Sequence, residues 1–393
     1  MSRMRAPIVI VGAGCAGLSL AVELVERGLS DGQRVVLLDA RKEYVRDRTW
    51  SFWNVIPHRF ESAITRRYAR WQVQNLERNA THESRDLSYC SIPSDAFYEI
   101  ARERLGRRKG QVDLVLDAHV SSVDDRGQSV LVTSTAGDVE ADWVFDSRPD
   151  TTRRPLASDV SLLQHFVGHT VELDRPAFDP SVATLMDFRV TQEHGIHFMY
   201  VLPESPTRAL LESTFFTAER AAPGVYERAI SAYARERLNA NVVHVVSREE
   251  GVIPMTTASF NAHPSKRVHR IGLAGGFAKP STGYAFLASQ KYAALAANAY
   301  AEGKLDREIV VRDKRKAFLD AVFLSYLVRH PENAPSLFVD LFDATPPDVL
   351  IRFLSETSSP LDELRGMQAL PTAPFAGEAL RSRRTWMHRL FSL

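Results

Sequence analysis

The chain has 393 residues, in which 49 Lys and Arg side chains nearly balance 48 Asp and Glu side chains to give a formal net charge of +1. This balance excludes a bulk electrostatic attraction to nucleic acid. Apolar residues make up 45% and charged residues 25%, which excludes a disordered, collagen-like or coiled-coil chain and favours two or three globular domains. Two cysteines, Cys15 and Cys90, cannot build a disulfide scaffold or, alone, a zinc site, and free thiols suit a reducing cytoplasm.

The start of the chain allows two interpretations. Arg3 and Arg5 precede a stretch without charge over residues 6–22, which is typical of a secretory signal. The same stretch carries three glycines that a dinucleotide-binding motif explains better. No stretch is long and apolar enough to predict a membrane span, so we expect a soluble or peripherally attached protein.

A strand, a glycine motif, a helix and a second strand are predicted in that order near the N-terminus. Residues 8–11 are β-branched and predict a buried parallel strand. Residues 18–27 predict a helix, and residues 35–38 predict a strand that ends at Asp39. The segment between the first strand and the helix matches G-x-G-x-x-G and reads Gly12, Ala13, Gly14, Cys15, Ala16, Gly17.

Each part of this motif has a mechanical role in binding a dinucleotide. Gly12 permits a tight turn, Gly14 lets the backbone approach a pyrophosphate, and Gly17 lets the helix pack closely on the strand. The helix N-terminus offers free N–H groups to phosphate oxygens. Asp39 is expected to accept hydrogen bonds from a ribose diol. This ordered set favours a dinucleotide site, which includes Ala13 and Ala16, over a structural glycine turn.

Three short strands further along favour FAD over NAD. Residues 120–123, 130–133 and 139–146 predict a β-meander with turns at Gly127 and Gly137. A meander inserted into the parallel sheet is common in FAD-binding folds, and the last strand ends at Asp146. A late segment repeats the anion-site pattern, because residues 271–276 predict a strand and turn and residues 285–300 predict a helix. An ordinary glycine-rich turn is the alternative for that late segment.

The middle of the chain predicts an antiparallel sheet and the end predicts helices. The predicted strands are residues 162–173, 182–190, 196–202 and 208–217, and residues 224–238 and much of 307–367 have helical spacing. We therefore predict an α/β fold with three parts. They are a Rossmann-type FAD-binding domain (1–150 and 265–305) whose parallel sheet carries the meander, an antiparallel-sheet substrate domain (151–264) and a helical C-terminal region (306–393).

The last residues combine basic and apolar side chains. Residues 381–393 hold four arginines and no acid, together with Trp386, Leu390 and Phe391. This mixture is typical of a helix that lies on a membrane surface. A C-terminal helix that packs on the rest of the protein would explain the same residues equally well.

At four segments the chain resembles the bacterial lycopene cyclases, a family of the FAD-dependent superfamily. The segments are the glycine motif from residue 9, Asp-Arg-Thr-Trp-Ser-Phe-Trp at 47–53, Arg-Ala-Leu-Leu-Glu-Ser-Thr at 208–214 and the late segment from Gly275 to residue 284. Together they extend from residue 8 to about 290. In one departure, Ser213 follows Glu212 where the family often has a second acid.

The resemblance implies a reaction, a cofactor and a set of site residues. The family cyclises the acyclic ψ-end of lycopene without net redox change and depends on reduced FAD, for which NAD(P)H is an electron source. Glu212 matches the family's essential acid, and Asp146 matches the acid that ends the meander. The element beside the flavin matches Gly275, Gly276, Pro280, Thr282 and Gly283. The resemblance favours a β-type ring in the product, but β, ε and γ rings differ only in which proton leaves, and the ring type and the number of cyclised ends stay open at this point. The implied partners are lycopene or a related ψ-end carotenoid and the inner face of the cytoplasmic membrane.

The chemistry requires an acid in a dry pocket, because an alkene must be protonated and a carbocation must close the ring. Burial would keep the Glu212 carboxyl protonated by raising its pKa. Leu210 and Thr214 are expected on its own face of the strand. Whether Glu212 gives the first proton, takes the last one or stabilises the cation stays open at this point. An anionic reduced flavin would stabilise the cation by preorganised charge.

Other side chains carry weaker signals. Aromatic faces for cation–π stabilisation could come from residues that are equally expected in a core, namely Trp50, Phe52, Trp53, Tyr284 and Phe286. Asp187 is expected at an exposed position of an alternating strand. The twelve histidines show no metal-binding spacing.

Two other functions compete with cyclisation. A flavin monooxygenase or an isoprenoid reductase could use the same fold, although aromatic hydroxylases usually carry Gly-Asp where this chain has Gly275-Gly276. A carrier of apolar lipids with a vestigial flavin site is the non-enzymatic alternative. The three separated flavin elements argue against that carrier.

Overall fold

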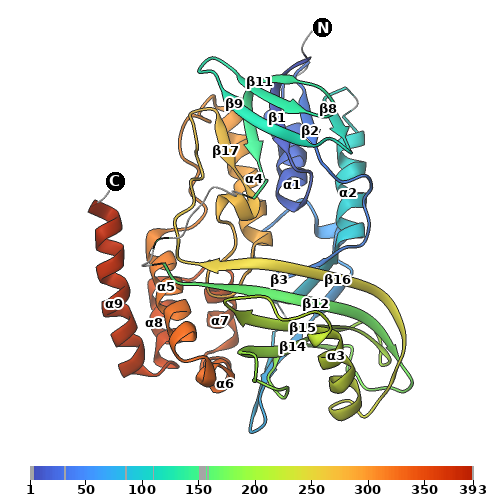
Figure 1. Cartoon of the computed structure of the whole chain (residues 1–393), viewed down its shortest axis with the longest axis vertical. Helices are drawn as coiled ribbons and strands as arrows, with labels where there is room; N and C mark the ends of the chain where they lie inside the picture. Colours follow the sequence, from blue (N-terminus) through green and yellow to red (C-terminus); the bar gives the residue numbers. More distant parts are fainter. Residues whose placement is uncertain are drawn as a thin grey trace.

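The computed structural model describes residues 4–391 except 31, 85, 109, 150–155, 157 and 158, and it describes no side chain for residues 28 and 384–391. Figure 1 shows three parts: a twisted sheet with helices α1 and α2 near the N-terminus, a second large sheet below it, and a group of C-terminal helices to one side. The expected boundary at 150–151 lies outside the described residues.

The first sheet confirms the predicted Rossmann-type arrangement. Its parallel strands lie in the order β8 (Val112–Val115), β2 (Val35–Leu38), β1 (Met4–Val11) and β11 (Val139–Asp146). The meander continues antiparallel from β11 to β10 (Val130–Ser134) and β9 (Val120–Asp125). The end of β11 also pairs in parallel with β17 (Val268–Arg270). The strand and turn predicted at 271–276 are both present, but the strand begins three residues earlier and ends at Arg270, and a 3-10 turn occupies Gly272–Gly275.

Helix α1 (Cys15–Glu23) begins inside the glycine motif, three residues before the prediction, and continues into a π-turn at Leu24–Gly28. Its side chains are buried on nearly every face, because it lies between the sheet and helix α4 (Phe286–Ala301). Close packing at its start depends on Gly17, where a Cβ atom would lie 2.0 Å from the carbonyl oxygen of Gly12. Helix α2 (Ser94–Gly106) also packs against α1.

The second sheet contains the four predicted strands and three that were missed. Among the described residues its order is β16 (Val242–Thr256), β12 (Ser161–Leu173), β15 (Arg208–Thr217), β14 (Ile196–Pro203), β13 (Val182–Asp187), β5 (Arg70–Gln74) and β6 (Asn79–Glu83). The expectation that residues 151–264 alone form this sheet is wrong, because β5 pairs in parallel with β13. The sheet is consequently mixed rather than purely antiparallel. A smaller sheet consists of β3 (Thr49–Trp53), β7 (Tyr89–Pro93) and β4 (Arg66–Tyr68).

The two faces of the second sheet have different neighbours. Helix α3 (Val225–Glu236) covers one face, where Ile230 and Tyr233 pack in one cluster with Val201 and Leu211. Side chains of the opposite face, such as Phe198, join a core with the C-terminal helices. That opposite face is the one on which a cavity forms.

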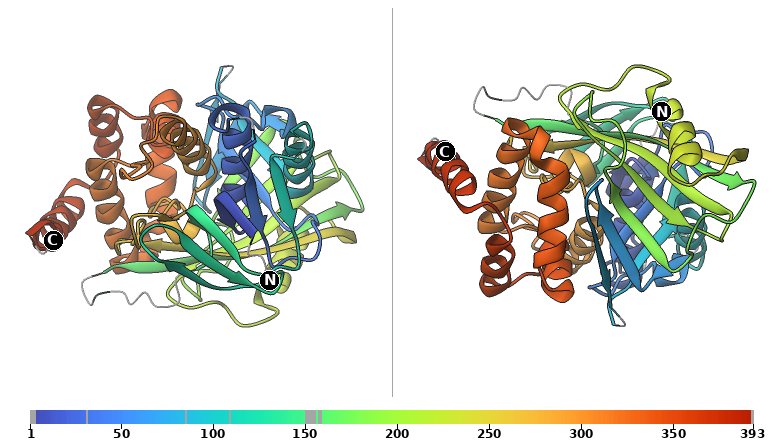
Figure 2. Two further views of the ribbon diagram at one scale, coloured as in Figure 1. Left: turned by 90° about the horizontal axis from the view of Figure 1, so that it is seen from above. Right: turned by 90° about the horizontal axis from the view of Figure 1, so that it is seen from below.

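The predicted C-terminal helical region is confirmed. It consists of α5 (Lys314–Arg329), α6 (Ala334–Ala344), α7 (Pro347–Leu354), α8 (Pro360–Gln368) and α9 (Thr372–Phe391), with a short 3-10 turn at Pro331–Asn333. Another 3-10 turn, Glu61–Ala63, lies between β3 and β4 and outside this region. Figure 2 shows these helices beside both sheets, with α9 outermost. Within the described ranges, no helix is long and apolar enough to cross a membrane. The proposed membrane-surface tail at 381–393 falls mostly on side chains outside the described residues.

Candidate active site

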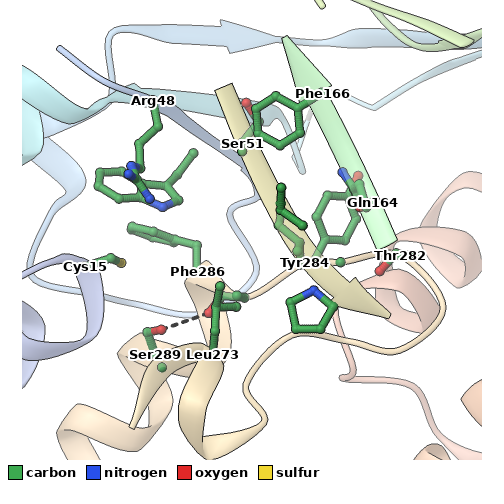
Figure 3. A pocket seen from close by; sticks show the side chains of 18 of the residues that line it. Cys15, Arg48, Ser51, Gln164, Phe166, Leu273, Thr282, Tyr284, Phe286 and Ser289 are labelled. Carbon is green, nitrogen blue, oxygen red and sulfur yellow. Dashed lines mark hydrogen bonds between the residues drawn. The ribbon is translucent and has the colours of Figure 1, made fainter. Parts of the chain in front are cut away.

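A cavity of about 660 Å³ lies between the glycine motif, the late segment and the second sheet. Figure 3 shows Cys15, Arg48 and Phe286 on one side of it and Phe166, Gln164, Tyr284 and Thr282 on the other. One end of the cavity is lined by the backbone of the glycine motif. The other end is apolar and is lined by Leu185, Met186, Phe198, Phe216, Phe338, Phe342 and Leu354.

The glycine motif presents backbone to the cavity, as predicted from its spacing. Gly14, Ala16 and Gly17 line the cavity, and the N-cap residue Gly14 makes no side-chain cap to the first turn of α1. The N–H groups of that turn are therefore available to an anion. Gly12 has φ +93°, and a Cβ atom on it would lie 2.0 Å from Ser147 Oγ, so only glycine fits this turn.

Asp39 is buried and ties the motif to the second strand. Its Oδ2 accepts a hydrogen bond from the Ala13 N–H at 2.5 Å, and its Oδ1 accepts bonds from the N–H and Nε of Arg41 at 2.8 and 3.0 Å. The carboxylate thus fixes the glycine turn, and contact with a ribose stays a prediction.

Two arginines that the sequence analysis missed add positive charge at this end. Arg41 and Arg48 both line the cavity, and a Cβ atom on Gly14 would lie 3.8 Å from Arg41 Nη2. Their charge complements a pyrophosphate bound at the helix N-terminus. The available signal was the recurrence of arginine at 41, 46 and 48, just after the second strand.

The late segment contributes some predicted residues directly and others through packing. Thr282 and Gly283 line the cavity, whereas Pro280 is not among its described lining residues. A Cβ atom on Gly275 would lie 2.4 Å from the Arg270 carbonyl oxygen, and one on Gly276 would lie 2.6 Å from the Phe260 ring. These two glycines therefore allow the close turn that places Gly272, Leu273 and Ala274 at the cavity.

Asp146 lies at the end of β11 but pairs with Arg148 at 2.7 Å and is absent from the described lining residues. Its backbone carbonyl accepts the N–H of Ile271 and so joins β11 to the late segment. Ser147 and Pro149, which follow it, line the cavity. Direct contact between Asp146 and a cofactor stays a prediction.

The donor and acceptor groups of the cavity fit a dinucleotide with a polar ring system. Gln164 Oε1 and Thr282 Oγ1 are buried, and neither has a hydrogen-bond partner in the described part of the chain. Both residues line the cavity, close to the N-terminal turn of α4. Buried polar atoms without partners are costly, so a ligand with matching polar edges would stabilise this arrangement.

Glu212 lies on β15 at the apolar part of the cavity, with only 7% of its surface exposed. Its Oε1 accepts a hydrogen bond from Thr214 Oγ1 at 2.7 Å, which confirms that both side chains share one face. Burial, and next the charge of Glu249, raise the pKa of Glu212 to about 8. Burial therefore favours the neutral form of this carboxyl group.

A cluster of three tyrosines lies beside Glu212. Tyr200 pairs with Glu212 in the register of β14 and β15. Its hydroxyl is 3.0 Å from that of Tyr89, which is 3.3 Å from that of Tyr284. Burial raises the pKa of Tyr284 to about 12, so its hydroxyl stays neutral. Sequence reasoning identified Tyr284 but missed Tyr89 and Tyr200.

Ser213, which departs from the family pattern, points to the opposite face. Its Oγ lies 3.0 Å from His197 Nε2, and both side chains are buried on the face that α3 covers. Because side chains alternate along a strand, an acid at position 213 would not enter the cavity beside Glu212.

The aromatic residues divide between core and cavity. Trp50, Tyr284 and Phe286 line the cavity, whereas Phe52 stacks on Phe286 at 4.3 Å and Trp53 is buried in the core. The expectation that Asp187 is exposed is wrong. It is fully buried, accepts a hydrogen bond from Tyr233 at 2.6 Å and pairs with Arg189 at 2.7 Å. In the described part of the chain, no group of three His, Cys, Asp or Glu residues is placed to hold a metal ion.

The fold is that of FAD-dependent reductases and monooxygenases. A geranylgeranyl bacteriochlorophyll reductase-like protein from Thermoplasma acidophilum superposes with a TM-score of 0.61 at 11% identity and covers 96% of this chain and 99% of its own. A Klebsiella pneumoniae HpxO variant in complex with FAD gives a TM-score of 0.56 at 15% identity, covering 94% of this chain and all of its own.

Within that class the chain belongs to the lycopene cyclase family, because the family model for lycopene cyclase protein matches residues 7–379. The lycopene beta-cyclase of Paracoccus sp. (strain N81106 / MBIC 01143) is 28% identical over 96% of this chain and 97% of its own length. The lycopene beta-cyclase of Pantoea ananas is 24% identical over 93% and 95%. The predicted family is thereby confirmed.

Proposed function

We propose that this protein cyclises the ψ-end of lycopene, or of a related carotenoid, to a β-type ring without net redox change and with reduced FAD bound. The observation that carries the proposal is the buried carboxyl group of Glu212 in the apolar part of a cavity that also reaches the glycine motif. Burial there raises the pKa of this group. Its relatives from Paracoccus and Pantoea carry the name lycopene beta-cyclase.

FAD would be held by the residues that already surround the polar end of the cavity. The first turn of α1 and the two arginines, Arg41 and Arg48, would bind the pyrophosphate, and Gln164 and Thr282 would meet polar ring atoms. Bound in its reduced form, with NAD(P)H as the electron source, FAD would supply fixed negative charge near a developing cation.

The chain itself supplies the acid and an apolar cavity lining that excludes water. Glu212 donates its proton to the terminal alkene, and the carbocation that results closes the ring. Phe198 and Phe216 keep water away from this cation, and the faces of Trp50 and Tyr284 stabilise it. Loss of a ring proton then completes an isomerisation.

The membrane partner is proposed from exposed apolar side chains of the C-terminal helices. Leu361, Leu364 and Met367 on α8 are exposed, and the basic tail at 381–393 follows in sequence. A long hydrocarbon substrate resides in a bilayer, so a peripheral enzyme on the cytoplasmic membrane gains access to it through such a surface.

The test is expression in a lycopene-accumulating bacterial host, followed by chromatography and absorption spectra of the extracted pigments. Cyclic carotenes of unchanged mass are expected. Mass-shifted products with stoichiometric NAD(P)H oxidation would support the reductase or monooxygenase alternative. Unchanged lycopene bound tightly to the purified protein would support a carrier instead.

A further inference from the structure

A second buried carboxylate lies in the same row of the sheet as Glu212. In β12, Gly168 pairs with Glu212 of β15 on one side and with Glu249 of β16 on the other. Residues paired across neighbouring strands point to the same face, so both acids project to the cavity side of the sheet. Glu249 is exposed by only 7%, like Glu212.

Both side chains approach the space over Gly168, the glycine between the two acids, although Glu249 is not among the described residues that line the cavity. A Cβ atom on Gly168 would lie 3.1 Å from Glu249 Cγ and 3.5 Å from Glu212 Cβ. Any larger side chain would stand between the two carboxyl groups. Glycine in the interior of a long strand usually marks such a close approach.

The surroundings of the two acids differ in charge. Glu249 Oε2 accepts a hydrogen bond from Thr49 Oγ1 at 2.8 Å, and Arg46 and Arg48, on the segment before β3, are the cations that favour its charged form. Glu212 accepts a hydrogen bond from the hydroxyl group of Thr214 in the same strand, and the neutral side chain of Tyr200 lies opposite Glu212 on β14. Burial raises the pKa of both, but only Glu249 has cations that oppose this rise.

We propose that Glu249 is a positioning residue that keeps the proton on Glu212. The pair holds one proton and one negative charge, with the charge on Glu249 toward Arg46 and Arg48 and the proton on Glu212 at the cavity. The negative charge of Glu249 disfavours ionisation of Glu212, so a second ionisation of the pair is opposed.

This inference rests on the proposed function for its chemical consequence, which is a direction of proton flow. The Glu212 O–H bond breaks and a C–H bond forms with the alkene electron pair, leaving a carboxylate and a carbocation. After ring closure a ring C–H bond breaks, its electron pair forms the ring alkene, and its proton returns to Glu212. The Glu249 charge favours that return, because it disfavours the doubly ionised pair.

The test is an infrared pH titration of the holoenzyme, with a pH profile of cyclisation measured beside it. The carbonyl band of a protonated carboxyl group should be present at neutral pH, disappear in Glu212→Gln, and titrate near pH 8. In Glu249→Gln the band should be lost at a lower pH, and the alkaline limb of the activity profile should shift to lower pH by a similar amount. Glu249→Asp should return the band titration and the activity profile toward those of the unchanged protein. Glu236→Gln, at an exposed acid on α3, should change neither the titration nor the profile.

Three results would overturn the assignment. They are an unchanged titration in Glu249→Gln, a band that survives in Glu212→Gln, and a band that disappears in Glu249→Gln at every pH. If Glu249→Gln does not fold, Gly168→Ala keeps both acids but separates them, and it should also lower the pH at which the band is lost. The infrared result does not depend on turnover. If the carbonyl band titrates as expected but no cyclic carotene forms, the proposed function is rejected while the interaction between the two carboxyl groups is supported.

Discussion

Lys279 and Asp320 form a buried ion pair with 2.6 Å between Nζ and Oδ1. Lys279 lies on the turn that leads to the cavity residues Thr282 and Gly283, and Asp320 lies on α5 of the C-terminal region. Ser281 Oγ donates to the same carboxylate oxygen at 2.6 Å. The C-terminal helices therefore hold the turn expected to contact the flavin, in addition to closing the apolar end of the cavity.

Replacing Asp320 by Ala should strongly destabilise the protein. The change leaves the Lys279 ammonium buried beside Glu356, which is 3.8 Å away and already paired with Arg312. We expect the free energy of unfolding to fall by about 3–5 kcal/mol, measured by urea denaturation. A double change, Lys279→Met with Asp320→Leu, should recover much of this loss. Glu302→Gln, at an exposed acid, is the control. If Asp320→Ala and Glu302→Gln lowered the free energy of unfolding equally, the role of the ion pair would be contradicted.

Replacing Glu212 by Gln should abolish ring formation while flavin remains bound. Glutamine keeps the shape and the Thr214 contact but carries no transferable acidic proton. We expect a loss of at least about 10²-fold in cyclisation rate. The measurement is pigment conversion in membranes, with the flavin-to-protein ratio as the folding control. Full conversion by Glu212→Gln would remove this residue from the mechanism.

The stability of the protein should depend on pH through Glu212. Its pKa is raised from 4.5 to about 8, so the folded state binds more protons than the unfolded state between these values. The free energy of unfolding should therefore fall as pH rises through this interval, by on the order of a few kcal/mol. Urea denaturation at about pH 5 and about pH 9 should show that the free energy of unfolding falls less in Glu212→Gln than in the unchanged protein. An equal fall in both proteins would mean that other groups cause it.

Replacing Gly17 by Ala should impair flavin binding and stability. The added methyl group would meet the Gly12 carbonyl oxygen at 2.0 Å, so α1 must move away from β1. We expect a loss of roughly 1–3 kcal/mol in stability and a lower flavin content of the purified protein. Gly106→Ala is the matched control, because open space surrounds that position at the end of α2. Normal flavin content in Gly17→Ala would contradict this view of the motif.

Membrane association should depend on the C-terminal region. Deletion of residues 381–393, and separately the double change Leu361→Ser with Leu364→Ser on α8, should reduce co-sedimentation with liposomes of anionic lipid. Val243→Ser with Val245→Ser is the control, since these valines are equally exposed but lie on the edge strand β16. Unchanged binding in both test proteins would place the membrane contact elsewhere.

Local patterns in the sequence predict the cofactor end of the molecule well. The glycine motif, the strand before it and the helix that begins in it are neighbours in the chain, so their local structure follows from spacing alone. Glu212 was identified because a family motif surrounds it. Arg41 and Arg48 were missed because only the folded chain shows that both line the cavity and that Arg41 approaches Gly14.

Non-local pairing explains the other errors. Strand β16 is mostly exposed at the sheet edge, so it lacks the alternation that marks a half-buried strand. Glu249 on that strand meets Glu212 only through the register of β12. Asp187 breaks the alternation rule because Arg189, Tyr233 and Gln74 satisfy its carboxylate inside the fold. The β5–β6 hairpin joins its sheet beside β13, about one hundred residues later in the chain.

The pairing of β11 with both β1 and β17 sets the order in which the protein can be completed on the ribosome. Val144 lies between Val9 of β1 and Val268 of β17 in the sheet. The nucleotide-binding half therefore cannot close until more than two thirds of the chain has been synthesised. Until then its apolar strands depend on partners that do not yet exist, and this exposes the nascent chain to chaperones and to aggregation. Synthesis rate should then influence the yield of folded protein, in addition to the stability of the finished fold.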